Sequence, residues 1–221
     1  MTQEELNKLI DEHDKWHHDR SQGKRLELRD VNLKDFFIGE KDLFQAQLEN
    51  VDLSDSDCED IRLAYANLKN VKFCGANLRK ANLNDCEMDN VDFTGANLEE
   101  AKLMSFVLAK NITFDNAQMD KASFIKSSMD FVSFKNASLV NADFFRTYCY
   151  EGNFENADLR GVRFSYATIY DCKVKGAIIE DADFSDARDL PEEWKQAIGW
   201  YSDEQENIRR IKQHLREHPV R

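Results

Sequence analysis

Large apolar residues recur at every fifth position over most of this chain, and this period excludes the ordinary secondary structures. Between Ala76 and Met104 the large residues are Leu78, Leu83, Met88, Phe93, Leu98 and Leu103, and a smaller residue precedes each by two positions. A helix would spread these side chains around its circumference, and a flat strand would place them alternately on opposite faces. The chain must therefore turn at a regular interval that brings every fifth side chain to one common axis.

The same register begins at Leu26 and runs through most of the sequence with a single interruption. Seventeen units without a slip end at Leu108, one residue is inserted in the segment 109–113, and fifteen further units run from Phe114 to Phe184. Internal repetition with so short a period is typical of a solenoid, in which each unit buries its apolar residues only against its neighbours.

The repeat units themselves resemble a known family. Their pattern, Ala-Asn-Leu or Ala-Asp-Leu/Phe, stands at Ala66–Leu68, Ala76–Leu78, Ala96–Leu98, Ala142–Phe144 and Ala157–Leu159, and it is similar to that of pentapeptide-repeat proteins. The resemblance implies an all-β solenoid, a right-handed quadrilateral parallel β-helix in which four units make one coil. Thirty-two units then give about eight coils, with an N-terminal capping helix and C-terminal helices.

Both ends of the repeat carry helical patterns that are suited to cover the open hydrogen-bonding edges of a parallel stack. Thr2 and Glu5 form a capping-box pattern ahead of apolar residues at helical spacing. Pro191 lies in the first turn of a predicted short helix, and Ser202 begins a second one with the apolar stripe Ile208, Ile211 and Leu215. We expect an N-terminal helical cap over 1–25, the pentapeptide-repeat β-helix over 26–187 and a C-terminal helical segment over 188–221.

Motif content favours a protein that is not an enzyme and holds no cofactor or metal. All five histidines lie in the terminal segments. His13 and His17 are four residues apart on a predicted helix, but a zinc site needs three or four ligands. The string from His214 to His218 matches a metalloprotease pattern, but it stands at the end of the chain, where no cleft is expected.

The cysteines and the hydropathy point to an ordinary cytoplasmic protein. Four of the five cysteines fall on inward positions and none shows CxxC spacing, so they are expected to act as small apolar side chains and not as metal ligands or a redox pair. No stretch of about eighteen apolar residues occurs, and we expect no membrane association.

The net charge of −12 lies almost entirely in the repeat, where residues 26–187 hold 29 acidic and 18 basic residues. If four units make one coil, every fourth unit stacks on the same face, so outward residues can be assigned to faces by counting. One face has ten acids against four bases, and we name it the acidic face: Glu40, Asp57, Glu59, Asp60, Glu99, Glu100, Asp120, Asp158, Glu180 and Asp181. Stacked carboxylates attract basic surfaces and repel nucleic acid. We expect a protein partner and no direct binding of DNA or RNA.

A near-neutral face and the edge beside it are rich in large apolar residues. We name this set the apolar patch: Phe44, Met104, Ile125, Phe145, Phe131, Tyr148, Tyr150, Tyr166 and Tyr170. Contiguous exposed aromatic residues usually mark a partner or a covering segment. A terminal helix or a protein partner can therefore lie there, and a homodimer through this patch or through the C-terminal helix is predicted.

Two functions follow from these features. The first is an acidic, rod-shaped scaffold for protein–protein interaction. The second follows from the resemblance, because family members similar to the quinolone-resistance proteins bind DNA gyrase and topoisomerase IV in place of duplex DNA. It implies a DNA mimic that modulates inhibition of gyrase or sensitivity to fluoroquinolones. The acidic faces and the register break agree with mimicry, whereas the modest net charge and the lack of a projecting loop between repeats do not.

Overall fold

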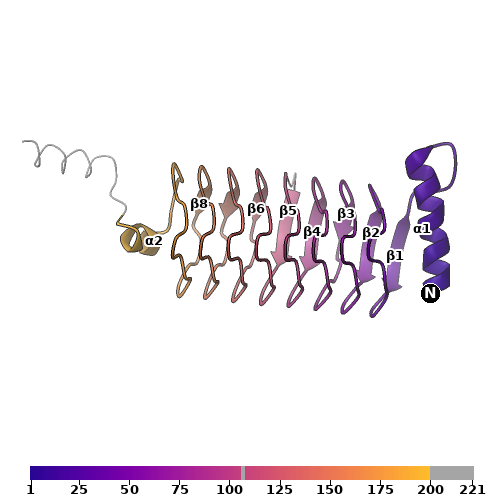
Figure 1. Ribbon diagram of the computed structural model, residues 1–221, viewed down its shortest axis with the longest axis horizontal. Coiled ribbons are helices and arrows are strands. Elements are labelled where there is room, and N and C mark those ends of the chain that lie inside the picture. The colour runs from indigo at the N-terminus through magenta and orange to yellow at the C-terminus, as the bar shows by residue number, and fades with distance from the viewer. Residues whose placement is uncertain (106–107, 200–221) are drawn as a thin grey trace, which may run out of the picture.

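The computed structural model describes residues 1–105 and 108–199, and its repeats stack into a long rod with a helix at each end (Figure 1). Eight parallel strands form one sheet in chain order. They are β1 (Glu27–Asn32), β2 (Gln47–Asp52), β3 (Asn67–Lys69), β4 (Glu87–Asp92), β5 (Leu108–Thr113), β6 (Ser128–Asp130), β7 (Tyr148–Tyr150) and β8 (Thr168–Tyr170). Leu28 lies opposite Leu48, and Leu48 lies opposite Leu68, so four five-residue units complete one coil. The predicted parallel β-solenoid is confirmed.

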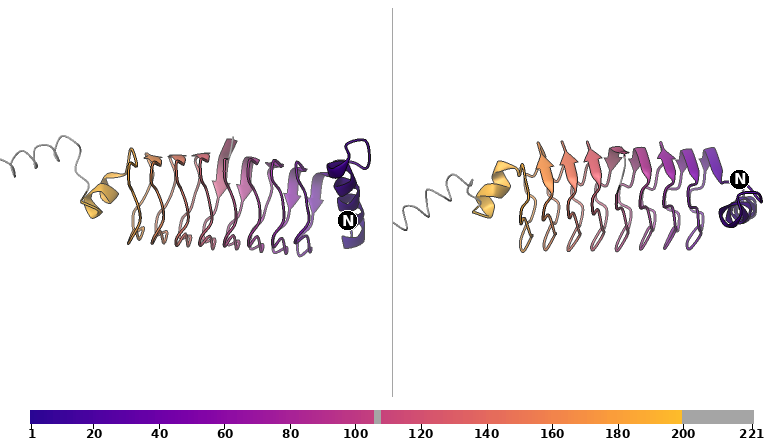
Figure 2. Two further views of the ribbon diagram at one scale, coloured as in Figure 1. Left: turned by 45° about the horizontal axis from the view of Figure 1, so that its top comes forward. Right: turned by 90° about the horizontal axis from the view of Figure 1, so that it is seen from above.

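The other sides of each coil are joined by single parallel bridges, whose columns begin at the pairs Phe37–Asp57, Asp42–Arg62 and Asp52–Lys72. The coils are therefore four-sided and stack in register along the whole rod, as the turned views in Figure 2 show. Each unit ends in a corner residue with positive φ, two positions after the large inward residue. Asn, Asp and Gly occupy most corners because they tolerate the left-handed conformation.

One line of corners is joined by an asparagine ladder. Asn50 Nδ2 donates a hydrogen bond to Asp30 Oδ1 at 2.7 Å, Asn70 donates to Asn50 at 2.8 Å, and Asn90 donates to Asn70 at 2.9 Å. These side-chain bonds link successive coils at the surface and add to the backbone bonds of the sheet.

Two columns of phenylalanine rings fill the axis from Phe73 to Phe184. The first column is Phe73, Phe93, Phe114, Phe134 and Phe154, with ring centroids 4.8–5.2 Å apart. The second column is Phe124, Phe144, Phe164 and Phe184, and its rings meet the first column edge to face. The residue two positions before each ring, such as Val91 before Phe93 or Ala122 before Phe124, is smaller than the ring and, except for Ala182, is buried. Only a small or medium-sized side chain fits beside a ring in this cross-section.

The extra residue in the repeat lies earlier than the sequence predicts. Met88 pairs with Ala109 and not with Leu108, and Ala109 pairs in turn with Met129. Ser105 still has the left-handed corner conformation of the first register, with φ of 57°. The insertion therefore lies between Ser105 and Ala109, and its placement at 109–113 is wrong. Leu108 and Ala109 are both apolar and adjacent in the sequence, and hydrophobicity alone favoured Leu108 as the inward residue. The structure has Ala109 at the inward position.

Helix α1 (Gln3–His18) covers the open edge of the first coil with polar side chains. The Gln3 amide donates to Phe37 O at 2.9 Å and accepts from Phe37 N at 3.1 Å. His13 Nδ1 accepts from Leu26 N at 2.9 Å. These side chains replace the backbone partners that a further coil would supply. The predicted capping box of Thr2 and Glu5 is present.

Helix α2 (Glu192–Ala197) closes the other end with one large aromatic residue. The Trp194 side chain is buried and lies 5.5–5.8 Å, between ring centroids, from Phe154, Phe164 and Phe184. It therefore covers the end of the phenylalanine columns. The second predicted C-terminal helix and the string from His214 to His218 lie outside the described residues.

The first prediction concerns the axis. Replacing Phe93 by Ala empties a fully buried position between two stacked rings and should lower the free energy of unfolding by about 3–5 kcal/mol. Glu99→Gln is the matched outward control and should change it by less than about 0.5 kcal/mol. Urea denaturation of both variants measures the difference. Equal effects of the two substitutions would mean that the axis is not the main source of stability.

The second prediction concerns pH and helix α1. Burial lowers the pKa of His13 below its ordinary value. The nearby charge of Asp42 opposes this shift, and that of His17 adds to it. A histidine with a lower pKa in the folded state stabilises the fold above its unfolded pKa of about 6.5, and this stabilisation is lost as pH falls through the folded pKa.

Backbone amides of α1 should therefore exchange hydrogen faster at pH 5 than at pH 8, after correction for the intrinsic pH dependence of exchange. The His13→Gln variant retains an acceptor for Leu26 N and should show a much smaller difference between the two pH values. Equal protection of α1 in the wild type at both pH values would contradict the prediction.

Candidate interaction surfaces

The structure places the ten residues of the acidic face along one side of the rod. A column of bridged residues that begins at Phe37 and Asp57 and ends at Asp158 and Ile178 runs along this side, and the acids lie in it or beside it. The side-by-side arrangement obtained by counting units is therefore observed. The ten carboxylates fall into two groups, according to whether they contact neighbouring side chains.

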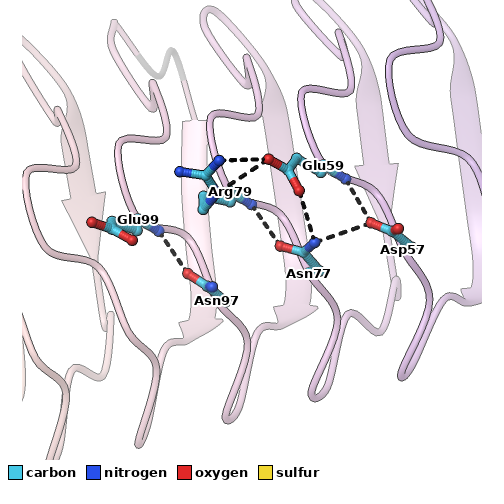
Figure 3. Close-up of polar contacts among 6 residues, drawn as sticks. All are labelled: Asp57, Glu59, Asn77, Arg79, Asn97 and Glu99. Atoms are coloured by element: carbon cyan, nitrogen blue, oxygen red, sulfur yellow. Dashed lines mark hydrogen bonds and ion pairs between the residues drawn. The ribbon is translucent and has the colours of Figure 1, made fainter.

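Four of the ten carboxylates are held by neighbouring side chains of the same face. Glu59 Oε1 accepts from Arg79 Nε at 3.1 Å and from Arg79 Nη2 at 2.8 Å, and Asn77 Nδ2 donates to both Glu59 and Asp57 (Figure 3). The hydrogen bonds from Arg79 are the main cause that lowers the pKa of Glu59. These contacts join adjacent coils, so these carboxylates serve the stability of the rod.

Two carboxylates of later coils are also held: Asp158 by an arginine of its own coil, and Asp120 by residues of the next coil. Asp158 accepts from Arg160 Nε at 2.8 Å and from Arg160 Nη2 at 2.6 Å, and these bonds are the main cause that lowers the pKa of Asp158. Asp120 accepts from Ser138 Oγ at 2.5 Å and from Val140 N at 3.1 Å.

The other six acids of the face have no ion pair among the described residues: Glu40, Asp60, Glu99, Glu100, Glu180 and Asp181. Four of them stand at left-handed corners and are exposed. Figure 3 shows the Glu99 carboxylate directed away from Arg79. Glu99–Glu100 and Glu180–Asp181 form two adjacent carboxylate pairs. They lie four coils apart, which corresponds to about 19 Å along the rod at the usual strand spacing.

Acids on the opposite face are offset by bases at every second strand. The outward positions that follow the inward residue of each strand from β1 to β6 are, in strand order, Arg29, Glu49, Lys69, Asp89, Lys110 and Asp130. Glu49 accepts ion pairs from Lys69 at 2.9 Å and from Arg29 at 3.2 Å. Alternating charges weaken each other's field, but Glu27, Asp30 and Glu87 lie on the same strands outside this row, so the face keeps a surplus of acids over β1 to β6.

Four of the nine residues of the apolar patch are half-buried. Phe44 stacks against His17 of helix α1 with ring centroids 4.7 Å apart, so the terminal helix does lie over this end. The guanidinium groups of Arg146 and Arg163 lie 5.1 and 4.6 Å from the centroid of the Phe145 ring. Three side chains are half-buried in addition to Phe44: Met104, Ile125 and Phe145.

The remaining residues of the patch form an exposed group around β6 to β8, which we name the aromatic cluster: Phe131, Tyr148, Tyr150, Tyr166 and Tyr170, each 43–62% exposed. Tyr150 stacks on Tyr170 with centroids 5.2 Å apart, and Phe131 meets Tyr150 edge to face at 6.2 Å. Tyr65 is similarly exposed at an earlier corner. Sequence reasoning missed Phe37 and Ile178, which are exposed at the two ends of the acidic face; their outward register position was a usable signal.

Two members of the aromatic cluster occupy corners that do not suit aromatic residues. Phe131 has φ of 57° and Tyr166 has φ of 59°. A bulky residue in the left-handed region is an outlier, and such outliers cluster at functional positions. Phe131 follows Asn111 in the corner line that carries the asparagine ladder in earlier coils. The aromatic ring therefore stands where asparagine would be more stable.

The third prediction follows from this corner. Phe131→Asn should raise the free energy of unfolding by about 1 kcal/mol, because Asn tolerates the left-handed conformation better than Phe. Tyr148→Asn is a control in the same cluster that does not stand at a left-handed corner, and it should give no gain. Urea denaturation measures both, and an equal effect of the two variants would show that the corner is not strained.

Neither a metal centre nor a membrane-spanning helix is found in the part of the chain that the structure describes. No group of three or more His, Cys, Asp or Glu side chains in residues 1–105 and 108–199 is arranged to hold a metal ion. Within the same residues, neither helix has the length and apolar character needed to cross a membrane.

Comparison with known proteins shows which family the repeat matches. The family description "Pentapeptide repeats (8 copies)" matches residues 42–79, 75–108 and 142–181. No curated protein matches the chain significantly. A solved structure of trypsin-treated QnrB1, a plasmid-mediated fluoroquinolone resistance protein, is 15% identical with a TM-score of 0.51, and the match covers 80% of this chain and 92% of that one.

HetL, a pentapeptide repeat protein involved in the regulation of heterocyst differentiation in the cyanobacterium Nostoc, is 18% identical with a TM-score of 0.26, covering 74% of this chain and 89% of its own. At such identities the structural likeness concerns the fold alone. The matched segments lie within the four-sided coils described above. The chain therefore belongs to the pentapeptide-repeat family.

Proposed function

We propose that this protein is a non-enzymatic interaction scaffold whose acidic face binds a basic surface of a protein partner. The observation that carries the proposal is the two carboxylate pairs, Glu99–Glu100 and Glu180–Asp181, which have no ion-pair partner in residues 1–105 and 108–199. Adjacent like charges repel each other, and a basic partner removes this repulsion. The stacked coils hold both pairs on one side of a rigid rod, so little order is lost on binding.

The aromatic cluster supplies a second, separate contact surface. It lies mainly on the sheet, the side of the coil opposite the acidic face. Exposed tyrosines and phenylalanines are the residues that most often anchor protein interfaces. A homodimer through this cluster stays a prediction, and so does a second partner that binds while the acidic face is occupied.

A more specific form of the proposal is the DNA mimic that binds DNA gyrase or topoisomerase IV. Carboxylates that repeat along one side of a narrow rod favour it, because they present charges in a row as the phosphates of a duplex do. Lys80 and Lys121 stand at corners of the same face, however, and Arg79 and Arg160 occupy two of its carboxylates. The negative charge is thus concentrated in clusters and does not form a continuous strip.

The fourth prediction tests the acidic face. The variant Glu99→Lys, Glu100→Lys, Glu180→Lys reverses three acids that have no ion pair in residues 1–105 and 108–199. It leaves the Glu59–Arg79 pair intact and should weaken binding of the partner about 100-fold. The control variant Asp35→Lys, Asp85→Lys, Glu87→Lys makes the same change of net charge on other faces and should bind normally. Pull-down from native cell extract with wild type and both variants identifies the partner that depends on these charges.

Titration of the purified partner in rising salt then measures affinity, which should fall steeply if carboxylates carry the contact. Retention of all partners by the acidic-face variant would refute the proposal.

A supercoiling assay with purified gyrase, with and without a fluoroquinolone, tests the mimic separately. Inhibition or drug protection by the wild type and by the control variant, but not by the acidic-face variant, would support mimicry. No effect at micromolar protein rejects gyrase as the partner and leaves the scaffold to the pull-down experiment.

A further inference from the structure

One inward column of the rod changes its chemistry abruptly near the C-terminal end. The positions two residues before the large inward residue of this side are Val31, Val51, Val71, Val91, Ile112 and Val132, and the next two are Gly152 and Cys172. Gly152 is not among the residues with positive φ, so its backbone conformation does not require glycine. A side chain at Gly152 would instead collide with the sulfur of Cys149 and lie 3.3 Å from that of Cys172. The glycine therefore makes room for two sulfur atoms.

The two thiols meet in this space although they are 23 residues apart. Cys149 Sγ and Cys172 Sγ are 3.7 Å apart, and Gly152 N donates a hydrogen bond to Cys172 Sγ at 3.2 Å. Cys149 is buried in β7, whereas Cys172 is half-buried in the following coil. The coil period of 20 residues brings them together, so a search for CxxC spacing could not find the pair. The expectation that the cysteines include no redox pair rested on that spacing alone.

The geometry points to a redox-active cysteine pair: Cys149 and Cys172 form a reversible disulfide by exchange with a small-molecule disulfide such as oxidised glutathione. The Cys172 thiolate attacks one glutathione sulfur and releases one glutathione thiolate. The Cys149 thiol then gives up its proton to solvent and attacks the Cys172 sulfur, which releases the second glutathione thiolate. Two protein thiols are oxidised, and one glutathione disulfide is reduced to two glutathione molecules.

The surroundings suit Cys172 as the attacking thiol. It lines a surface hollow with Tyr170, Asp171 and the residues that lead into helix α2, so a small disulfide can reach it. The interaction with Cys149 is the main cause that lowers the pKa of Cys172, and the Gly152 N–H adds to it, while burial opposes it. The same pairing, together with burial, raises the pKa of Cys149. The more exposed sulfur is therefore the one that ionises first, as the attacking thiol must.

The disulfide would join the last coil of the rod to the one before it. Inward residues of the last coil, among them Ala177, Ile179 and Ala182, are only half-buried, whereas their counterparts in earlier coils are buried. Bond formation shortens the sulfur separation from 3.7 Å to about 2.05 Å, and the more open last coil can shift to allow it. Oxidation then fixes the coil that carries Tyr170 of the aromatic cluster and leads into α2.

The fifth prediction is a specific cross-link in the full chain. The reduced protein is incubated with oxidised glutathione, blocked with N-ethylmaleimide and digested with trypsin without reductant. Mass spectrometry should find peptide 147–160, which holds Cys149, joined to peptide 164–173, which holds Cys172, and dithiothreitol should separate them. Cys74, which is also half-buried, should instead retain glutathione as a mixed disulfide, because no second thiol is next to it among the described residues.

Two comparisons make the result decisive. In the folded wild type the cross-link should form at least about tenfold faster than in urea, because the fold holds the sulfurs together. Oxidation should also slow tryptic cleavage after Lys173 and Lys175 in the wild type, about tenfold, and should not change it in Cys172→Ser. The Cys74→Ser variant should keep both effects. Glutathione retained on Cys172 without a cross-link, or equal rates in folded and unfolded protein, would overturn the inference.

Discussion

The fixed cross-section of the coil is the constraint on which the rest of this structure depends. Backbone bonds such as Leu33 N to Asp52 O, Phe93 N to Thr113 O and Phe164 N to Asp183 O, each 2.7 Å, tie every coil to the next at one spacing. The interior can then neither widen nor narrow from coil to coil. One large and one small side chain per unit fill it, and a missing or added methylene cannot be absorbed by sliding one coil over another.

A rod built in this way has two open ends, and the chain closes them by different physical means. At the first coil, polar backbone atoms lack the hydrogen-bond partners that a further coil would provide. The Gln3 amide and the His13 ring of α1 supply these partners. At the last coil, the apolar rings of the phenylalanine columns would be open to solvent, and Trp194 of α2 covers them. Both devices remove an edge on which further strands could add.

The corner residues show how one backbone position serves several purposes. Every unit needs a left-handed residue there, and asparagines such as Asn50 and Asn70 use the position to link coils through their side chains. Glu100 and Asp181 place exposed charge at it, and Phe131 and Tyr166 place exposed rings. Because the side chain at a corner points away from the axis, the rod tolerates these choices, and the surface can vary while the interior stays constant. The proposed binding surfaces depend on this freedom.

The sequence by itself determined the repeating architecture, because a five-residue period of inward side chains requires a turn at a regular interval. The resemblance of the units to pentapeptide repeats implies four units per coil, and that count assigns outward residues to faces. The stacking of the acidic face and the capping box at Thr2 and Glu5 followed from the same local patterns. Only the tertiary structure decided that Ala109 takes the inward position, that Arg79 engages Glu59 and leaves Glu99 free, and that His17 covers Phe44. It also brought Cys149 against Cys172. These outcomes depend on side-chain torsions and on contacts between residues about one coil apart, and a pattern of residue types along the chain carries no information about either.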